Sequence, residues 1–402
     1  MNQLLLVMPT LRARFEADGT LTTTRKFLDG MQKYVELWPG PIRLLMQQTP
    51  DSDSNLDHVT VRIQDLPFNV VQTSFSDAQA LRREFAAAGV LLASLDHEQV
   101  LVSSLCAEVG APCVYVSEYS LRTRYQIIDT STHNPLLRWR RRLWASRLEG
   151  RQRKAVKRAS GIQCNGTPTF DAYKPLNPSP HLYFDTRVSP GLIVSPELMR
   201  DRLARMMAGG PIKLAFSGRL AKMKGADHLV KIALALRAMG VDFRLDIFGN
   251  GECASDMKRE IASNNLGDRV FMRGVLRFAE ELMPEMSANV DLAILPHPQG
   301  DPYCTYLETL SAGVPIAGYA NEAWTGVQRT AKAEIGVSTK LGDPEPLAAA
   351  IAELARDRAR LARMSEAGRL FALGHTFDDT FKRRIDHLLS VRSAFSQTTP
   401  QV

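Results

Sequence analysis

The chain has 402 residues, too many for one ordinary domain and enough for two domains of roughly 150–200 residues each. Its 45% hydrophobic and 23% charged residues exclude wholesale disorder, a collagen-like chain and a coiled coil. No apolar run approaches the ~20 residues that cross a bilayer, and the start of the chain lacks the basic flank and cleavage site of a signal peptide. We therefore expect a cytoplasmic protein.

Short apolar runs of strand length alternate with amphipathic helical patterns along most of the chain. This alternation favours βαβ crossovers, and hence parallel sheets with helices on both faces. A typical helix is predicted at His228–Met239, where Leu229, Ile232 and Leu236 share one face. The predicted strands are Leu4–Pro9, Ile42–Gln47, Val90–Leu95, Cys113–Ser117, Gly161–Asn165, Ile212–Ser217, Phe243–Phe248, Val270–Arg273, Asp291–Leu295 and Val314–Tyr319.

The Pro/Ser-rich stretch Pro175–Pro196 falls between the two sets of strands and is typical of a link between domains. The predicted fold class is α/β, with two doubly wound, Rossmann-like domains facing a central cleft. We assign residues 1–185 to the first domain, 186–208 to the linker, 209–375 to the second domain and 376–402 to a final helix and tail.

The five cysteines are odd in number, widely scattered and without any C-x-x-C spacing. This pattern argues against both a disulfide framework and a zinc site, so we expect buried free thiols. The cysteines are Cys106, Cys113, Cys164, Cys253 and Cys304.

Positive charge is concentrated in the segment 138–158, which has ten basic residues and one acidic residue. Its local charge of +9 exceeds the +7 of the whole chain, so all other residues together carry −2. Two interpretations are open, because an apolar stripe runs through the same segment: a helix at an anionic membrane surface, or a helix packed on its own sheet with a solvated basic face. Nucleic acid is not expected, because no recognition fold accompanies the charge. The membrane interpretation uses Arg138, Trp139, Arg140, Arg141, Arg142 and Trp144.

Ligands of open parallel sheets bind beyond the carboxyl ends of the strands. In the second half of the chain, the segments that follow the predicted strands are rich in glycine and contain fixed positive charge. Small residues and cations beside helix starts suit a diphosphate. These segments are Gly218–Gly225, Gly249–Glu252, Gly274 and Pro296–Cys304.

From Ala215 to Gly326 the sequence resembles the nucleotide-sugar half of family-4 glycosyltransferases of the GT-B fold. The resemblance implies a retaining transfer from a nucleoside-diphosphate sugar, with no further cofactor, and a last helix that packs back on the first domain. The matching segments are Phe216–Leu220 with Lys224-Gly225, Ile247–Gly251, Val270–Gly274, Asp291–Pro296 and Leu307–Pro315.

The resemblance implies that Arg219 and Lys224 grip the diphosphate, whose negative charge grows as the sugar leaves. The nearby Lys222 is equally basic. Glu308 corresponds to a motif glutamate that accepts hydrogen bonds from ribose hydroxyls. In an alternative interpretation, Glu308 only closes a capping box that starts at Thr305.

A further family glutamate, which contacts the donor sugar, would stand eight residues earlier, where this chain has Gly300. Asp301 replaces that glutamate if the loop is one residue shorter. Otherwise the sugar contact is lost, and the donor differs or the site is degenerate. The other donor contacts that the resemblance implies come from the amides of Tyr303, Cys304 and Thr305 and from Gly218, Gly249, Gly251, Gly274 and Val275.

In the first domain, Asp18-Gly19-Thr20 resembles a glycine loop that approaches the donor phosphates from in front of a helix. Glu118 follows the strand Cys113–Ser117, and it either orients the acceptor or acts as a base, or is an exposed loop acid. His97 is a lesser catalytic candidate. We interpret Asp51-Ser52-Asp53, which matches D-x-D, and Gly249-Asn250-Gly251, which lacks the rest of a dinucleotide fingerprint, as turns.

The leading hypothesis is a glycosyltransferase that extends a surface polysaccharide or a lipid-linked glycan, in the cytoplasm or on the inner face of the plasma membrane. We expect it to work without a metal, because fixed cations face the diphosphate. A nucleoside-diphosphate-sugar epimerase is an alternative of another enzyme class. A degenerate member that binds nucleotide or membrane without turnover is the non-enzymatic alternative.

Overall fold

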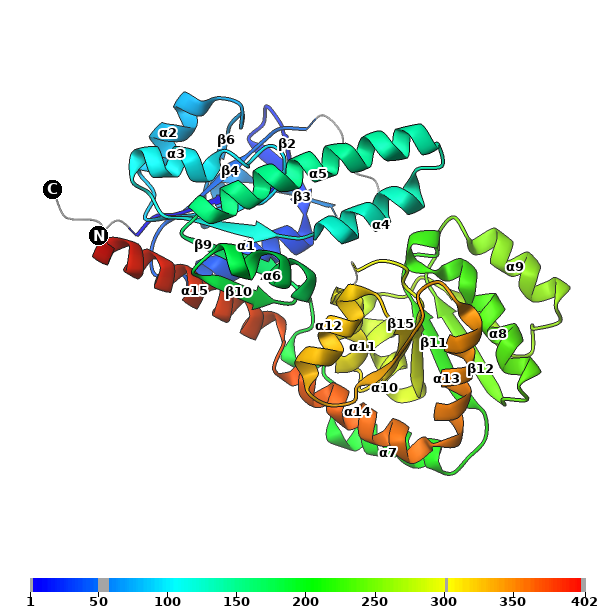
Figure 1. Ribbon diagram of the computed structural model, residues 1–402. Helices are drawn as coiled ribbons and strands as arrows, with labels where there is room; N and C mark the ends of the chain where they lie inside the picture. Colours follow the sequence, from blue (N-terminus) through cyan, green and yellow to red (C-terminus); the bar gives the residue numbers. More distant parts are fainter. Residues whose placement is uncertain (1–2, 50–57, 301–302, 399–402) are drawn as a thin grey trace. The chain divides into compact units, whose positions relative to one another are not determined.

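The computed structural model describes residues 3–49, 58–300 and 303–398 (Figure 1). The chain divides into two compact units. The first consists of Met1–Leu121, Arg141–Tyr183 and Asp378–Val402, and the second of Arg122–Arg140 and Phe184–Phe377. Within the described residues, no helix combines the length and the hydropathy needed to span a bilayer.

The first unit is built on a seven-stranded parallel sheet with strand order β10-β9-β8-β7-β1-β4-β6. Apolar side chains of these strands alternate between the two faces, and both faces are buried because helices cover them. The strands are β1 (Leu5–Met8), β4 (Ile42–Met46), β6 (Asn69–Gln72), β7 (Val90–Ser94), β8 (Cys113–Ser117), β9 (Gly161–Asn165) and β10 (Pro180–Tyr183).

One face of this sheet packs on a core formed with α2 (Ala78–Ala86), α3 (Val102–Val109), α5 (Pro135–Arg158) and α6 (Thr167–Tyr173). The core includes Leu6, Leu91 and Tyr115 from the strands and Phe85, Cys106 and Val156 from the helices. Burial of such side chains contributes about 1.5–3 kcal/mol each, so this layer stabilises the unit.

The last helix, α15 (Phe377–Thr398), packs on the first unit together with α1 (Arg25–Leu37). Phe381 meets the Tyr34 ring edge-on, with 5.4 Å between centroids. Arg384 donates from Nε to Gln163 Oε1 on β9 at 2.8 Å. Gly161 permits this close packing, because a Cβ there would lie 2.9 Å from a Val391 methyl carbon.

A small antiparallel sheet of β2 (Arg14–Phe15), β3 (Thr20–Thr24) and β5 (His58–Arg62) completes the first unit. Our sequence reading did not anticipate it, and it missed β6 and β10 as well. Strand β10 lies inside the Pro/Ser-rich stretch that we interpreted as a linker. Pro180 opens this strand at the edge of the sheet, a position where its missing N–H costs no ladder bond.

The second unit contains a six-stranded parallel sheet with order β13-β12-β11-β14-β15-β16. The predicted strands Ile212–Ser217 and Phe243–Phe248 are confirmed with the same bounds, and three others differ by one or two residues at one end. The strands are β11 (Ile212–Ser217), β12 (Phe243–Phe248), β13 (Val270–Gly274), β14 (Leu292–Leu295), β15 (Ile316–Tyr319) and β16 (Gly336–Thr339).

The helices of this unit include α8, which confirms the helix predicted over residues 228–239 and buries Leu229, Ile232 and Leu236. Helix α7 (Pro196–Met207) lies inside the segment that the sequence assigned to a linker. Its N-cap is Ser195, whose hydroxyl accepts from the Leu198 amide at 3.2 Å. The helices are α4 (Leu121–Ser131), α7 (Pro196–Met207), α8 (Leu229–Ala238), α9 (Ala254–Ser263), α10 (Met283–Asn289), α11 (Tyr303–Ser311), α12 (Glu322–Ala331), α13 (Pro344–Arg356) and α14 (Arg358–Leu373).

Candidate functional site

The loops that follow β11, β12 and β13 are joined backbone to backbone at the carboxyl edge of the second unit's sheet. Gly218 donates its amide to Phe248 O at 3.1 Å, and Gly249 donates to Gly274 O at 2.7 Å. A Cβ on Gly249 would lie only 1.9 Å from Gly218 O, and φ is +129° there, so only glycine fits. These predicted glycines thus form one compact, side-chain-free surface.

The two cations of the predicted diphosphate grip follow β11 in this surface. Arg219 is exposed, and Lys224 is half-buried at the end of a 3-10 turn, Lys222–Lys224. Gly225 comes next with φ +69°, and a Cβ there would lie 1.9 Å from Pro296 O. The glycine therefore lets the Lys224 turn press against the loop after β14. The equally basic Lys222 is exposed, and its amide donates to Glu252 Oε1 at 3.3 Å.

The loop after β14 buries two polar side chains that the sequence reading missed, His297 and Gln299, each 1% exposed. The imidazole of His297 lies near the rings of Phe216 and Tyr306, with centroid distances of 6.4 and 5.8 Å. Burial and the charge of Lys224 lower the pKa of His297 well below its ordinary value. Within the described part of the chain, neither His297 Nδ1 nor the Gln299 amide group has a hydrogen-bond partner.

Helix α11 starts at Tyr303, so the amides of Tyr303, Cys304 and Thr305 belong to its first turn. Such amides have no carbonyl partner within the helix and attract anions. The Cys304 thiol donates to Asp185 Oδ2 at 3.4 Å. The Asp301 position, proposed for the donor sugar, lies outside the described residues, as does the Tyr303 side chain.

Glu308 does not close a capping box, because Thr305 lies inside the helix rather than at its N-cap. The capping interpretation is wrong: tertiary contacts engage the carboxylate instead. Arg187 Nε donates to Glu308 Oε1 at 2.6 Å, and its guanidinium lies 3.7 Å from the centroid of the Phe278 ring. The Glu308 side chain is 12% exposed and that of Arg187 is 50% exposed. Sequence spacing gave no signal for Arg187.

Gly300 stands where the resemblance implies a sugar-binding glutamate, and a side chain there would have to displace neighbouring side chains. A Cβ would lie 2.9 Å from Glu322 Cγ and 3.3 Å from Thr123 Oγ1. The Gly300 amide donates to Gln126 Oε1 at 3.3 Å. Glu322 Oε1 accepts from Thr123 at 2.6 Å. A carboxylate from the start of α12 therefore lies beside Gly300, which the sequence reading also missed.

In the first unit, Glu118 follows β8 at the carboxyl edge of the sheet and is exposed. Asn165 Nδ2, at the end of β9, donates to Glu118 Oε2 at 2.7 Å, and the Tyr183 hydroxyl, at the end of β10, donates to Oε1 at 3.3 Å. Two neighbouring strands thus orient this carboxylate. His97 is exposed in the loop between β7 and α3, and its ring meets Trp144 edge-on at 5.8 Å.

Gly19 lies in the turn between β2 and β3, with φ +79°. Our expectation that it directly precedes a helix is wrong. The threonine-rich segment Thr20–Thr24 forms a strand that pairs with β5, and α1 starts only at Arg25. Asp18 shapes the turn by accepting from the Thr20 amide and hydroxyl at 3.0 and 2.7 Å.

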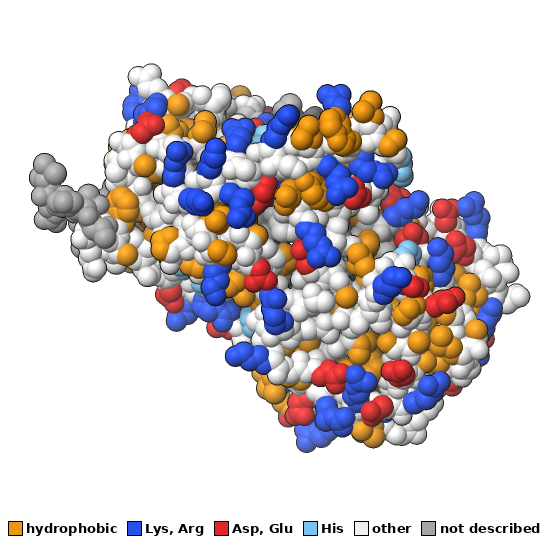
Figure 2. Space-filling model, viewed as in Figure 1, with side chains coloured by type: hydrophobic (Ala, Val, Ile, Leu, Met, Phe, Trp, Pro, Cys, Tyr) orange, Lys and Arg blue, Asp and Glu red, His pale blue; other side chains and the backbone are white. Residues whose placement is uncertain are grey.

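The basic segment forms α5, and its apolar stripe divides into two parts. The carboxyl-terminal part is buried in the core of the first unit through Leu148, Ala155 and Val156. The amino-terminal part is exposed: 61% of Trp139 and 55% of Trp144 remain accessible. Figure 2 shows apolar and basic side chains interleaved along this helix. The predicted membrane residues therefore lie on the surface.

The metal-nucleotide string Asp51-Ser52-Asp53 lies outside the described residues. Among the residues that the structure describes, no group of three or more His, Cys, Asp or Glu side chains is arranged to hold a metal ion. Four of the cysteines are buried, and all five are free thiols.

Two Rossmann-like units, of which the second has a glycine-lined carboxyl edge with fixed cations, define the GT-B class of fold. Residues 204–371 match the model of the family Glycosyl transferases group 1, so this part of the chain is similar to that family.

Known proteins resemble the chain in sequence and in structure. It is 30% identical over 123 residues to the 2-deoxystreptamine glucosyltransferase of Streptomyces kanamyceticus, a match that spans 31% of this chain and 31% of the relative. Its fold resembles Anabaena Alr3699/HepE in complex with UDP, with a TM-score of 0.63, 13% identity and coverage of 96% and 99% of the two chains. It also resembles sucrose-phosphate synthase from Thermosynechococcus elongatus, with a TM-score of 0.59, 14% identity and coverage of 98% and 100%.

Proposed function

We propose that the protein is a glycosyltransferase that moves a sugar, with retention, from a nucleoside-diphosphate sugar to a glycan or lipid-linked acceptor in surface polysaccharide synthesis. The main support for this proposal is the carboxyl edge of the sheet in the second unit. Arg219, Lys224, the first turn of α11 and Glu308 all lie there. The structures of Anabaena HepE with UDP and with UDP-glucose support the choice of donor.

In the proposed reaction, the bond between the sugar's anomeric carbon and the diphosphate oxygen breaks, and a bond to the acceptor oxygen forms. Arg219, Lys224 and the α11 amides stabilise the charge that develops on the departing diphosphate, without a metal. The acceptor's hydroxyl proton leaves on a base. Glu118 is our candidate for that base or for orienting the acceptor, and His97 and Gly19 are secondary candidates on the first unit.

For the nucleoside, we propose that Glu308 accepts hydrogen bonds from the ribose hydroxyls. Its Oε1 already accepts from Arg187, and a carboxylate has further acceptor positions on both oxygens. Arg187 then holds the carboxylate in one orientation through its own contact with Phe278. Gly274 and Val275 line the nucleoside in this proposal.

For the donor sugar, Asp301 and Glu322 are the two carboxylates that we propose in place of the glutamate missing at Gly300. Glu322 is supported by its position 2.9 Å from the place of a Gly300 Cβ. If neither serves, the site is degenerate, and the crowding at Gly300 is the observation that favours a nucleotide-binding protein without turnover.

We further propose that the exposed end of α5 attaches the protein peripherally to an anionic membrane, such as the inner face of the plasma membrane. The exposed Trp139 and Trp144 beside arginines support this proposal, because such side chains suit the headgroup region.

A thermal-shift screen against UDP, GDP, ADP and their sugars tests the donor proposal. A nucleotide at 100 times its Kd raises stability by about 2.7 kcal/mol, so the matching base produces a clear rise in melting temperature. Product analysis of the best donor, alone and with acceptors, follows. Sugar transfer or slow donor hydrolysis supports the transferase, a converted nucleotide sugar indicates an epimerase, and binding without any turnover indicates the degenerate protein.

A further inference from the structure

Two adjoining hollows lie at the carboxyl ends of β4 and β6 in the first unit, away from Glu118 in the strand order of the sheet. The larger has a volume of about 510 Å³ and the smaller about 400 Å³. Gln47 and Ser74 line both, so the hollows form one continuous groove. Its size is within the range of about 300–1,000 Å³ that is usual for small-molecule sites.

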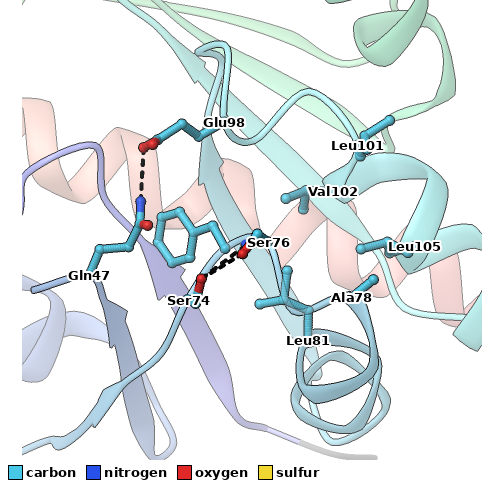
Figure 3. A pocket seen from close by; sticks show the side chains of 10 residues that line it. Gln47, Ser74, Ser76, Ala78, Leu81, Glu98, Leu101, Val102 and Leu105 are labelled. Atoms are coloured by element: carbon cyan, nitrogen blue, oxygen red, sulfur yellow. Dashed lines mark hydrogen bonds between the residues drawn. The ribbon is translucent and has the colours of Figure 1, made fainter.

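The larger hollow has an apolar floor between α2 and α3 (Figure 3). Leu81 and Val102 are each 2% exposed, and Leu105 is 8% exposed, so the floor is part of the core layer. Leu101 stands at the rim and is 61% exposed. The remaining apolar lining comes from Phe75 and Ala78. An apolar group seated here would cover Leu101 and displace water from these side chains.

The smaller hollow is polar and uncharged. It is lined by Gln47, Gln48, Gln72, Thr73 and Ser74. Primary amides offer both donors and acceptors, which suits the hydroxyl groups of a polyol. Two of these amides are already aligned with each other, since Gln72 Nε2 donates to Gln48 Oε1 at 2.7 Å.

Among the described residues that line the groove, Glu98 is the one with a charged side chain, and its carboxylate is engaged. Arg12 Nη2 donates to Glu98 Oε1 at 2.5 Å, and Gln47 Nε2 donates to Oε2 at 2.8 Å, as the dashed line in Figure 3 shows. Neither lysine nor arginine lines the groove among the described residues. The guanidinium of Arg12 beside the groove is already paired with Glu98, so a phosphate or diphosphate would have to compete with that carboxylate, whereas a neutral ligand would bury no unpaired charge.

We propose that this groove binds the non-reacting end of the acceptor, a neutral glycoside with an apolar substituent, whereas Glu118, beyond β7 and β1 in the strand order, faces the reacting end. The sugar hydroxyls bind to the amides of the smaller hollow, and the alkyl or aryl group fills the apolar floor of the larger one. The role as acceptor rests on the proposed function, whereas binding of such a glycoside does not. The proposal excludes lipid diphosphates as ligands of this groove, because its lining, among the described residues, has no charge complementary to a diphosphate.

Calorimetric titration of the full chain with octyl β-D-glucopyranoside, below its micelle concentration, tests the proposal. Ala78→Phe fills the larger hollow, and Ala86→Phe makes the same change at an exposed position of the same helix that does not line it. We expect binding to weaken at least about tenfold in Ala78→Phe and to remain unchanged in Ala86→Phe. Octyl phosphate, which has the same chain and a charged head, should bind at least about tenfold more weakly than the glucoside.

Two further variants keep the test decisive if Ala78→Phe does not fold. Leu101→Asp changes only the exposed rim and should weaken glucoside binding, and Gln72→Ala should weaken it while leaving octyl phosphate unaffected. Equal glucoside binding by the wild type and all three groove variants, or tighter binding of octyl phosphate, would overturn the proposal. UDP affinity measured on the same samples reports on the donor site separately, so a failure of the proposed function is distinguishable from a failure of the groove.

Discussion

Replacing Glu308 by Gln tests the proposed ribose contact. The contacts of Glu308 in the structure allow the expected changes in stability and UDP affinity to be estimated. The Arg187–Glu308 pair has a distance of 2.6 Å, but half of the Arg187 side chain is exposed, so loss of the pair costs about 0.5–1 kcal/mol of stability. That corresponds to a fall in melting temperature of about 1–4 °C. Glutamine keeps one acceptor atom and loses the charge, so UDP binding should weaken by about 1.5–2 kcal/mol, or roughly 10- to 30-fold.

The matched control is Arg187→Gln, which removes the same ion pair and leaves the carboxylate intact. It should lower the melting temperature as much as Glu308→Gln does, while UDP affinity falls less than in Glu308→Gln, because the acceptor for the ribose remains and only its orientation is lost. Calorimetric titration with UDP and thermal denaturation of both variants provide the two measurements. If UDP affinity is the same in the wild type and in Glu308→Gln, or if both variants lose affinity equally, the reasoning about Glu308 is refuted.

Three further predictions concern the metal, the membrane and the pH dependence. Turnover should persist in excess EDTA, because fixed cations and the α11 amides neutralise the diphosphate; loss on chelation with recovery by Mg²⁺ or Mn²⁺ would redirect attention to Asp51 and Asp53. Replacing Arg140, Arg141 and Arg142 by Gln should weaken binding to phosphatidylserine vesicles, measured by co-sedimentation, by about 1 kcal/mol of binding free energy per charge. A wild-type protein that does not bind such vesicles at low salt would contradict the membrane proposal. Burial and the neighbouring His387 lower the pKa of His181 to about 4. Between about pH 6.5 and pH 4, the unfolded chain therefore binds a proton at His181 that the folded protein does not bind. Stability should therefore fall as the pH drops from about 6.5 toward 4, and His181→Phe, which keeps the ring stacked on His387, should reduce that fall; identical pH profiles would contradict this cause.

The central strands of both sheets were predictable because they are buried on two faces and read as continuous apolar runs. Ile212–Ser217 and Gly161–Asn165 are examples. The missed strands are short or polar, and most lie at sheet edges, whereas β3 is the middle strand of the small antiparallel sheet. Asn69–Gln72 has no buried residue, and Pro180–Tyr183 starts with a residue that usually signals a break. Local pattern cannot distinguish such strands from loops, because tertiary pairing decides their conformation.

Part of the candidate site could also be predicted from the sequence, because glycines and cations that directly follow a strand can be recognised from the local sequence. Gly249 and Gly225 are needed for close backbone approach, and their positions after strands point to that need. The sequence did not predict that Arg187, His297 and Glu322 belong to the candidate site. Each acquires its place through contacts with residues far away in the chain, such as Arg187 with Glu308 and Glu322 with Thr123. The capping interpretation of Glu308 failed for the same reason.

The central claim is that Arg219 and Lys224 stabilise a departing nucleoside diphosphate. Its most direct test is the rate of nucleoside-diphosphate release from the donor that the thermal-shift screen identifies, measured for the wild type, Arg219→Ala and Lys224→Ala. Lys222→Ala removes an exposed neighbouring cation and is the matched control. We predict a loss of roughly 2–4 kcal/mol in transition-state stabilisation for each of the two variants, or about 30- to 1,000-fold in rate, with little change for the control. Release rates that are the same in all four proteins would contradict the claim.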